Sequence, residues 1–206
     1  MNFRYPNGSR YVDHGLSKNL KVNAAQNNST IFSDRGMSLE DEINKSNQYY
    51  LQNDIAVIHK KPTPISIVSV DYPKRSAARI KEAYFSKAST TDYNGVYRGK
   101  YIDFDAKETK SKISIPLKNF HEHQVIHLHK CLMQGGICFV MIKFDFDQSI
   151  YLLKASDLIV FWDNQKNGGR KSIPKKDIEN LGYKVNYGFN PLISYLHAVD
   201  LIIDSQ

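Results

Sequence analysis

Two acidic residues and a lysine are spaced as magnesium-dependent phosphodiester chemistry requires. Asp92 is followed, a short hairpin later, by residues 101–107, which read Tyr-Ile-Asp-Phe-Asp-Ala-Lys. In an extended strand alternate side chains share a face, so Asp103, Asp105 and Lys107 point one way while the apolar residues between them point into a core. Side chains two positions apart lie roughly 6.6 Å apart, which leaves room for a hydrated cation and a phosphate oxygen. The spacing therefore predicts a nuclease site.

Each of these side chains has a role in that chemistry. Magnesium prefers near-octahedral oxygen coordination and keeps several waters, so Asp92 and Asp105 suffice as its charged ligands. A bound metal activates water and stabilises the charge that develops on the phosphate, and Lys107 can neutralise the same transition state. The alternative is a surface strand whose acids and lysine pair only with one another. The upstream position of Asp92, in a hairpin, favours the nuclease interpretation.

A histidine-rich segment at residues 121–129, His-Glu-His-Gln-Val-Ile-His-Leu-His, raises the question of zinc. A zinc-protease helix needs its second histidine at position 125, where this chain has Val125. His123 and His127 lie four apart, but we expect no dedicated zinc site, because no cysteine lies at ligand spacing. Gln124 is more interesting as a neutral oxygen donor, since a helix after the hairpin could lay it across the acidic strand.

Positive charge concentrates around this candidate site. Lysine and arginine number 28 against 21 aspartate and glutamate residues, which gives a net charge of +7. Between residues 59 and 100, nine basic residues face three acidic ones. Clustered positive charge favours a polyanionic partner, because each neutralised phosphate releases counterions, although a solvated basic face is the alternative. The candidate DNA-binding residues are Lys60, Lys61, Lys74, Arg75 and Arg79.

Aromatic residues accompany this basic segment. Tyr72, Tyr84 and Phe85 lie near Lys74 and Arg75 in the sequence. Charge combined with aromatic faces is typical of surfaces that bind phosphates and stack exposed bases. The alternative is that Tyr84 and Phe85 belong to the hydrophobic core.

Cysteine content and hydropathy indicate a reducing compartment and no membrane span. Cys131 and Cys138 are the only cysteines and make neither a disulfide framework nor a zinc knuckle, so we read them as reduced core thiols. The longest apolar run, residues 137–142, is far shorter than the roughly 20 residues that cross a bilayer. The N-terminus lacks the apolar core of a signal peptide. We therefore expect a cytoplasmic protein.

The order of predicted elements indicates an α/β fold. Residues 1–34 are polar and aperiodic, so we expect a disordered or loosely attached arm before a single domain at 35–206. Ser38 resembles the N-cap of a helix over 38–52, and Arg98-Gly99 resembles a hairpin turn. Helices alternate with strands thereafter. The other predicted strands are 55–59, 65–70, 137–144 and 149–153, and the other predicted helices are 116–134, 175–181 and 192–203.

The sequence resembles the RecU family of Holliday-junction resolvases from Gram-positive bacteria. The similar blocks follow one another from about residue 35 to the C-terminal helix. The resemblance implies a restriction-endonuclease-like fold, that is, a mixed sheet flanked by helices with a projecting stalk at about residues 61–85. It also implies a homodimer, Mg²⁺ dependence with Mn²⁺ as a substitute, and paired nicking of four-way junctions in recombination and repair. The blocks are residues 35–40, 55–64, 72–76, 82–85, 89–95 and 106–110.

The resemblance further assigns residues to the site. By matching motif, the metal ligands are Thr90, Asp92, Asp105 and Gln124, and Lys107 stabilises the transition state. Arg75 is implied to contact DNA from the stalk, and Glu40 is a candidate to support the metal ligands. The family also implies contact with the recombinase RecA and association with the nucleoid.

Asp105 is a departure, because the family usually has glutamate at this position. Aspartate is shorter by one methylene, about 1.5 Å, so we expect activity to survive with altered metal affinity or metal choice. The leading interpretation is a structure-selective endonuclease, which as a homodimer would place two sites for symmetric incision. The alternative is a junction-binding protein that bridges strands or modulates RecA without cutting. A sequence-specific restriction enzyme is a third reading, against which the basic appendage argues.

Overall fold

The computed structural model describes residues 37–74, 77–86 and 90–205, and Met37–Gln206 cluster as one unit. The arm expected at residues 1–34 lies outside the described residues. The helices are α2 (Leu39–Gln52), α3 (Glu122–Met133), α4 (Ala155–Lys166), α5 (Lys175–Leu181) and α6 (Tyr195–Asp204), with a 3₁₀ turn η2 (Leu117–Asn119). The strands are β1 (Val57–Lys60), β2 (Ile65–Asp71), β3 (Arg79–Phe85), β4 (Tyr93–Tyr97), β5 (Lys100–Thr109), β6 (Ser114–Pro116), β7 (Ile137–Phe144), β8 (Ser149–Lys154), β9 (Ser172–Pro174) and β10 (Tyr183–Val185).

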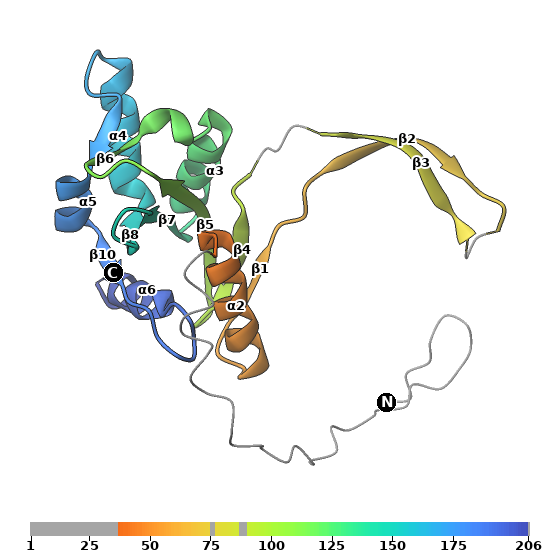
Figure 1. Cartoon of the computed structure of the whole chain (residues 1–206), viewed down its shortest axis with the longest axis horizontal. Helices are drawn as coiled ribbons and strands as arrows, with labels where there is room; N and C mark the ends of the chain where they lie inside the picture. Colours follow the sequence, from red (N-terminus) through yellow and green to blue (C-terminus); the bar gives the residue numbers. More distant parts are fainter. Residues whose placement is uncertain (1–36, 75–76, 87–89, 206) are drawn as a thin grey trace. The chain divides into compact units, whose positions relative to one another are not determined.

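A six-stranded mixed sheet forms the centre of the fold, in the order β1-β4-β5-β7-β8-β10 (Figure 1). The two central strands, β5 and β7, run parallel, and β4 and β8 pair antiparallel on either side of them. Helices α2 and α6 share one hydrophobic cluster with the sheet, while α3 and α4 share the other. This mixed sheet flanked by helices confirms the predicted fold class.

The sheet is the middle of three layers, and strand β7 is covered on both of its faces. All of its residues are buried, as its apolar sequence Ile-Cys-Phe-Val-Met-Ile-Lys-Phe predicts for a strand covered on both faces. Phe139 and Met141 join the cluster that contains α2 and α6, whereas Val140 and Ile142 join the cluster that contains α3 and α4. Alternate side chains of one strand therefore connect both cores.

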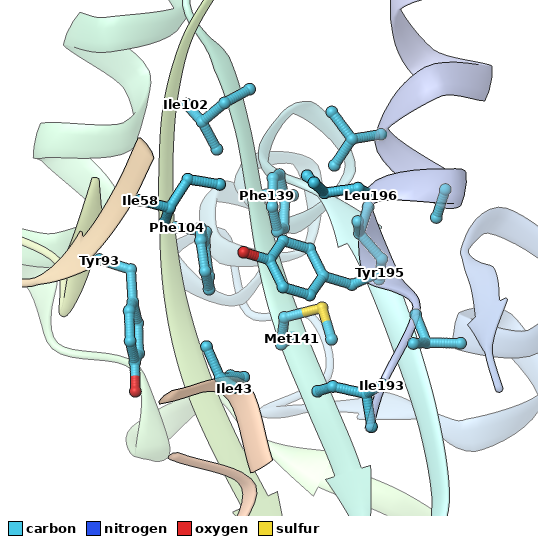
Figure 2. Packing of buried hydrophobic residues seen from close by; sticks show 14 of the residues in the cluster. Ile43, Ile58, Tyr93, Ile102, Phe104, Phe139, Met141, Ile193, Tyr195 and Leu196 are labelled. Atoms are coloured by element: carbon cyan, nitrogen blue, oxygen red, sulfur yellow. The ribbon is translucent and has the colours of Figure 1, made fainter. Parts of the chain in front are cut away.

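Strand β5 shows the predicted alternation. Its apolar residues enter the cluster of α2 and α6, where the Phe104 ring stacks between those of Tyr93 and Phe139 at centroid distances of 4.8 and 4.6 Å (Figure 2). Asp103 and Asp105 alternate with these residues and so face the side that α3 covers. The strand thus anchors itself on one face and presents its acids on the other.

Helix α2 begins where the sequence predicts. The Ser38 side chain accepts a hydrogen bond from the backbone N–H of Asp41 at 3.2 Å, and three acidic residues occupy the first turn. An oxygen-bearing cap and acidic residues both stabilise the positive end of a helix. The prediction of a helix over residues 38–52 is confirmed.

Strands β2 and β3 form a separate antiparallel pair inside the segment predicted to be a stalk. Most of their side chains are exposed, including Tyr84 at 62% and Phe85 at 83%. The alternative that Tyr84 and Phe85 belong to the core is therefore wrong. Strand β3 was not among the predicted elements, and the projecting stalk itself stays a prediction.

The predicted continuous helix over residues 116–134 is wrong at its beginning. Residues up to Pro116 form β6, which pairs with β9, and the 3₁₀ turn η2 follows. The backbone is then extended at Phe120 and His121 before α3 begins. Ile115, Leu117 and Phe120 are all buried, so this segment packs its side chains in an irregular path that no helical period describes. Helix α4 was not predicted, because its large apolar residues, 158–162, are consecutive and show no helical period.

A substitution at Gly95 tests the β1–β4 edge of the sheet. A Cβ at this position would lie 2.0 Å from Val57 O and 2.6 Å from Ile58 Cα, both backbone atoms that can yield only if β1 moves. We expect Gly95→Ala to lower the free energy of unfolding in urea by about 1–3 kcal/mol, as overpacking does. Val96→Ala, at the exposed neighbouring position, serves as the control. Equal stability of the two variants would contradict this packing.

Candidate metal and nucleic-acid site

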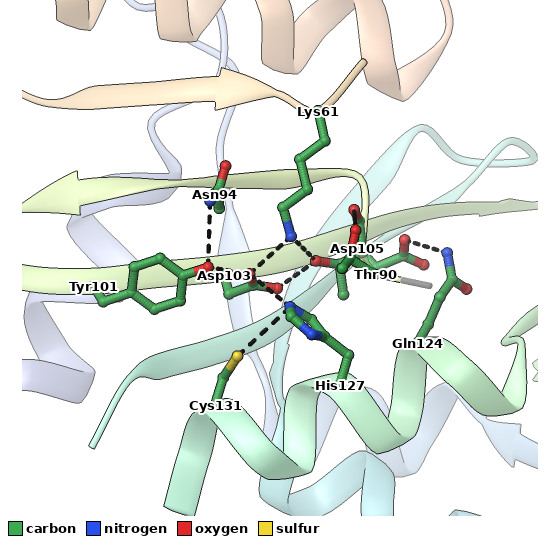
Figure 3. A network of polar contacts seen from close by, with 10 residues as sticks. Lys61, Thr90, Asn94, Tyr101, Asp103, Asp105, Gln124, His127 and Cys131 are labelled. Atoms are coloured by element: carbon green, nitrogen blue, oxygen red, sulfur yellow. Dashed lines mark hydrogen bonds and ion pairs between the residues drawn. The ribbon is translucent and has the colours of Figure 1, made fainter. Parts of the chain in front are cut away.

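The site lies between strand β5 and helix α3, at the beginning of strand β4 (Figure 3). Strand β5 carries Asp103 and Asp105, which are 0% and 1% exposed. Asp92 directly precedes β4, and Gln124 lies in the first turn of α3. Buried carboxylates are costly unless hydrogen bonds or opposite charges compensate them, so the partners of each acid define what the site can do.

Asp105 has a polar contact on each oxygen. Gln124 lies across this strand, as the sequence suggested, but its amide nitrogen rather than its oxygen makes the contact: Nε2 donates to Asp105 Oδ1 at 2.8 Å. Lys107 Nζ forms an ion pair with Oδ2 at 2.5 Å, although Oδ2 receives no hydrogen bond of normal geometry from the described residues. Burial, followed by a hydrogen bond with the Asp92 carboxyl, raises the pKa of Asp105 to about 8, while Lys107 lowers it. A cation between the two carboxyl groups would favour their charged forms.

Asp103 is the most highly connected acid of the site. Its Oδ2 accepts from Lys61 Nζ at 2.9 Å and from the Tyr101 hydroxyl at 2.7 Å, and it lies 3.1 Å from His127 Nε2. Its Oδ1 accepts from the Thr91 hydroxyl. Burial and the contact with Asp103 raise the pKa of Tyr101 to about 12. Asp103 therefore organises the polar network beside Asp105.

Lys61 lies within this network. Its side chain is 18% exposed, and its ammonium group contacts both Thr91 Oγ1 at 2.8 Å and Asp103. Its backbone N–H donates to Asp92 O at 2.7 Å, which ties the end of β1 to the beginning of β4. In the structure Lys61 is therefore a partner of the buried acid Asp103. Its predicted DNA-binding role stays a prediction.

The other predicted DNA-binding residues lie outside this network. Lys60 pairs with Glu40 at 2.5 Å, with both side chains more than two-fifths exposed. Lys74 and Arg79 are exposed, beside and within the β2–β3 pair. Arg75 lies outside the described residues. Their contact with DNA stays a prediction.

Thr90 and Glu40 approach the acids from neighbouring segments. Thr90 is half-buried and donates its hydroxyl to Thr91 O at 3.3 Å. Glu40 accepts at its backbone oxygen from the Tyr93 hydroxyl at 3.3 Å. Burial, then Glu40 and Asp92, raise the pKa of Tyr93. The role of Thr90 as a metal ligand and that of Glu40 as its support stay predictions.

The premise that no cysteine lies at ligand spacing to the histidine-rich segment is wrong. Cys131 follows His127 by four positions and therefore lies at ligand spacing on one face of α3. Cys131 Sγ is 3.5 Å from His127 Nε2, and Cys131 is half-buried, whereas Cys138 is buried as expected. Asp103, His127 and Cys131 form a group that could hold a metal ion, and this group is separate from the predicted magnesium ligands.

Sequence reasoning found the acids but missed most of their partners. The contacts of Lys61, Thr91 and His127 with Asp103 join residues 42, 12 and 24 positions apart, which no local period reveals. Only the four-residue spacing of His127 and Cys131 was visible in the sequence.

Within residues 37–74, 77–86 and 90–205, no helix is long and apolar enough to cross a bilayer.

A mixed sheet flanked by helices, with two acids and a lysine at its central strands, places the protein in the restriction-endonuclease-like class. Residues 34–201 match the sequence model of a family described as "Recombination protein U", abbreviated RecU. The chain is 63% identical to "Holliday junction resolvase RecU" of Lactiplantibacillus plantarum over 204 residues, 99% of this chain and 97% of the relative. Proteins of the same name from Limosilactobacillus reuteri and a Geobacillus species are 61% and 55% identical over 206 residues, the full length of both chains. The chain belongs to the RecU family, and the resemblance inferred from its motifs is confirmed.

Proposed function

We propose that the protein is a magnesium-dependent endonuclease that resolves Holliday junctions by paired, symmetric nicks in recombination and repair. The observation that carries the proposal is the buried carboxyl group of Asp105, whose Oδ2 lies 2.5 Å from Lys107 Nζ, with the half-buried Asp92 carboxyl close enough to raise its pKa. Two carboxyl groups and an ammonium group at one point suit a cation and a phosphate. The relatives named Holliday junction resolvase support the choice of substrate.

The donor set fits magnesium. Asp92 and Asp105 supply carboxylate oxygens, Thr90 a hydroxyl and Gln124 an amide oxygen, and all of these are hard ligands. The raised pKa of Asp105 reflects a buried carboxyl next to another acid, a pairing that a divalent cation relieves. Gln124 presents Nε2 to Asp105, while its Oε1 accepts from His121 N at 3.2 Å. As a metal ligand, Gln124 must exchange these two roles.

The chain's own residues orient the reacting groups. When bound, magnesium supplies an activated water and neutralises charge on the phosphate. Lys107, held against Asp105 and 15% exposed, donates its ammonium hydrogens to the oxygen on which negative charge develops. Gln124 and the Asp103 network fix the strand that carries both groups. The substrate phosphate would therefore contact charged groups that are held in position and partly shielded from water.

The basic segment supplies DNA binding in this proposal. Lys74, Arg75 and Arg79 neutralise phosphates, and the exposed rings of Tyr84 and Phe85 suit the unpaired bases of a junction centre. We infer that residues 61–85 project as a stalk toward that centre. Binding should therefore weaken steeply with salt.

The paired incision determines which oligomeric state the proposal requires. Two nicks in strands of like polarity require two active sites at fixed separation, which a homodimer provides. We infer that the enzyme acts in the cytoplasm at the nucleoid, with RecA as a further partner.

Cleavage of a labelled four-way junction tests the function directly. With Mg²⁺ the protein should yield symmetric nicks near the crossover, and Asp92→Ala should abolish them. Tight binding without product, from the protein and the variant alike, would support the alternative of a non-cleaving protein that bridges strands or modulates RecA. Cleavage of linear duplex at a fixed site would instead indicate a restriction enzyme.

Asp105→Glu tests the departure from the family pattern. The longer side chain restores the family's usual glutamate and reaches about 1.5 Å further toward the metal. We expect this variant to cleave junctions as well as the parent chain or faster. Junction cleavage rates under equal Mg²⁺ provide the measurement. A loss greater than about tenfold, which corresponds to roughly 1.4 kcal/mol of barrier, would mean that the site is built around the shorter side chain.

A further inference from the structure

Three side chains beside the proposed nuclease site converge on one point. One oxygen of Asp103, Nε2 of His127 and Sγ of Cys131 all lie within 4.8 Å of one another. Asp103 comes from β5, whereas His127 and Cys131 lie one helical turn apart on the face of α3 that covers β5. Figure 3 shows these three side chains directed toward each other.

The two distances from His127 are close to those around a small tetrahedral cation. Zinc binds sulfur at about 2.3 Å and nitrogen or oxygen at about 2.0–2.1 Å, so its ligand atoms lie roughly 3.3–3.6 Å apart. Here Nε2 lies 3.1 Å from Asp103 Oδ2 and 3.5 Å from Cys131 Sγ. A mixed sulfur, nitrogen and oxygen set also suits zinc rather than magnesium, which takes oxygen alone.

We propose that Asp103, His127 and Cys131 bind zinc or a cation of the same class, at a site separate from the magnesium ligands. His127 and Cys131 line a cavity of about 550 Å³, which leaves these two ligands accessible from solvent, although Lys100 and Lys130 line it too and Asp103 lies behind it. Three protein ligands and one water make up a common zinc environment.

The position of Lys61 provides a second test of the proposed metal site. Its ammonium group lies 2.9 Å from Asp103 Oδ2 and repels a cation there, and the Tyr101 hydroxyl donates to the same oxygen at 2.7 Å. Binding must move both groups away from this oxygen, and only Lys61 opposes the cation by its charge. Lys61→Met, which removes the charge but keeps an unbranched side chain, should therefore bind the metal more tightly than the parent chain.

Cobalt titration of the full chain tests the site. Co²⁺ in a tetrahedral thiolate site gives visible absorption and a sulfur-to-cobalt charge-transfer band in the near ultraviolet, and Zn²⁺ should abolish both. Cys131→Ser should lose the charge-transfer band. His127→Gln should weaken binding by more than the roughly 10–100-fold that changes around a metal site's ligands cost. Circular dichroism of each variant establishes that it is folded.

Matched controls separate this site from its neighbours. His129→Gln changes an exposed histidine of the same helix, and Cys138→Ala removes the other thiol, and both should retain the spectrum. Absence of the charge-transfer band in the parent chain would overturn the proposal, as would its persistence in Cys131→Ser or its loss in Cys138→Ala. Displacement of Co²⁺ by equimolar Mg²⁺ would overturn it too, because the cation would then occupy the oxygen site.

Discussion

Replacing Lys107 with alanine should lower the rate of junction cleavage by on the order of 10²–10³-fold, as removal of one transition-state donor does in other enzymes. The Lys107 ammonium group is positioned by its 2.5 Å contact with Asp105 and by burial, so water cannot replace it in the same geometry. Binding of the junction should change little, because one phosphate contact among many is lost. Single-turnover cleavage and a gel-shift titration measure the two effects separately.

Lys110→Ala is the matched control for that experiment, since Lys110 is an exposed lysine of the same segment. It should cleave at nearly the parent rate. A fall in Lys107→Ala of less than about tenfold, or an equal fall in both variants, would contradict a transition-state role for Lys107.

Lys143→Met should lower the free energy of unfolding by about 3–5 kcal/mol, the cost of leaving one partner of a buried ion pair alone. Lys143 and Glu42 are 3% and 2% exposed, and Nζ lies 2.7 Å from Glu42 Oε1. Tyr187 OH also donates to Glu42, at 3.1 Å, and burial already raises the pKa of this acid. The pair connects α2 to β7. Urea unfolding gives the measurement.

The double variant Glu42→Leu/Lys143→Met distinguishes charge from packing. Two apolar side chains leave no unpaired charge, so most of the lost stability should return. Two results would contradict a stabilising role for this ion pair between α2 and β7. One is a single variant as stable as the parent chain, and the other is a double variant less stable than Lys143→Met.

Local patterns predicted the parts of the fold that local physics determines. The apolar run of β7, the alternation of β5 and the Ser38 cap each appear in consecutive residues, and all three are confirmed. The predicted helix over residues 116–134 begins too early, because β6 pairs with β9 some sixty positions away. No helical period contains that information.

The contacts of the site also fall into those that the sequence suggested and those that only the structure reveals. The order of hairpin and helix suggested that Gln124 could lie across the strand of Asp105, and the structure joins them at 2.8 Å, through Nε2 of Gln124. Lys61 was predicted only as a DNA-binding residue, because its partner Asp103 lies 42 positions away. Tertiary folding alone brings such pairs together, so their effect on the acids is absent from the sequence.

Anomalous diffraction from crystals of the junction complex with Mn²⁺ tests the central claim most directly. Manganese takes the oxygen ligands that magnesium takes and can be located by its own scattering. The account predicts a peak between Asp92 and Asp105, within coordination distance of a carboxylate oxygen of each. Carboxylates held apart, with no peak between them while DNA is bound, would contradict it.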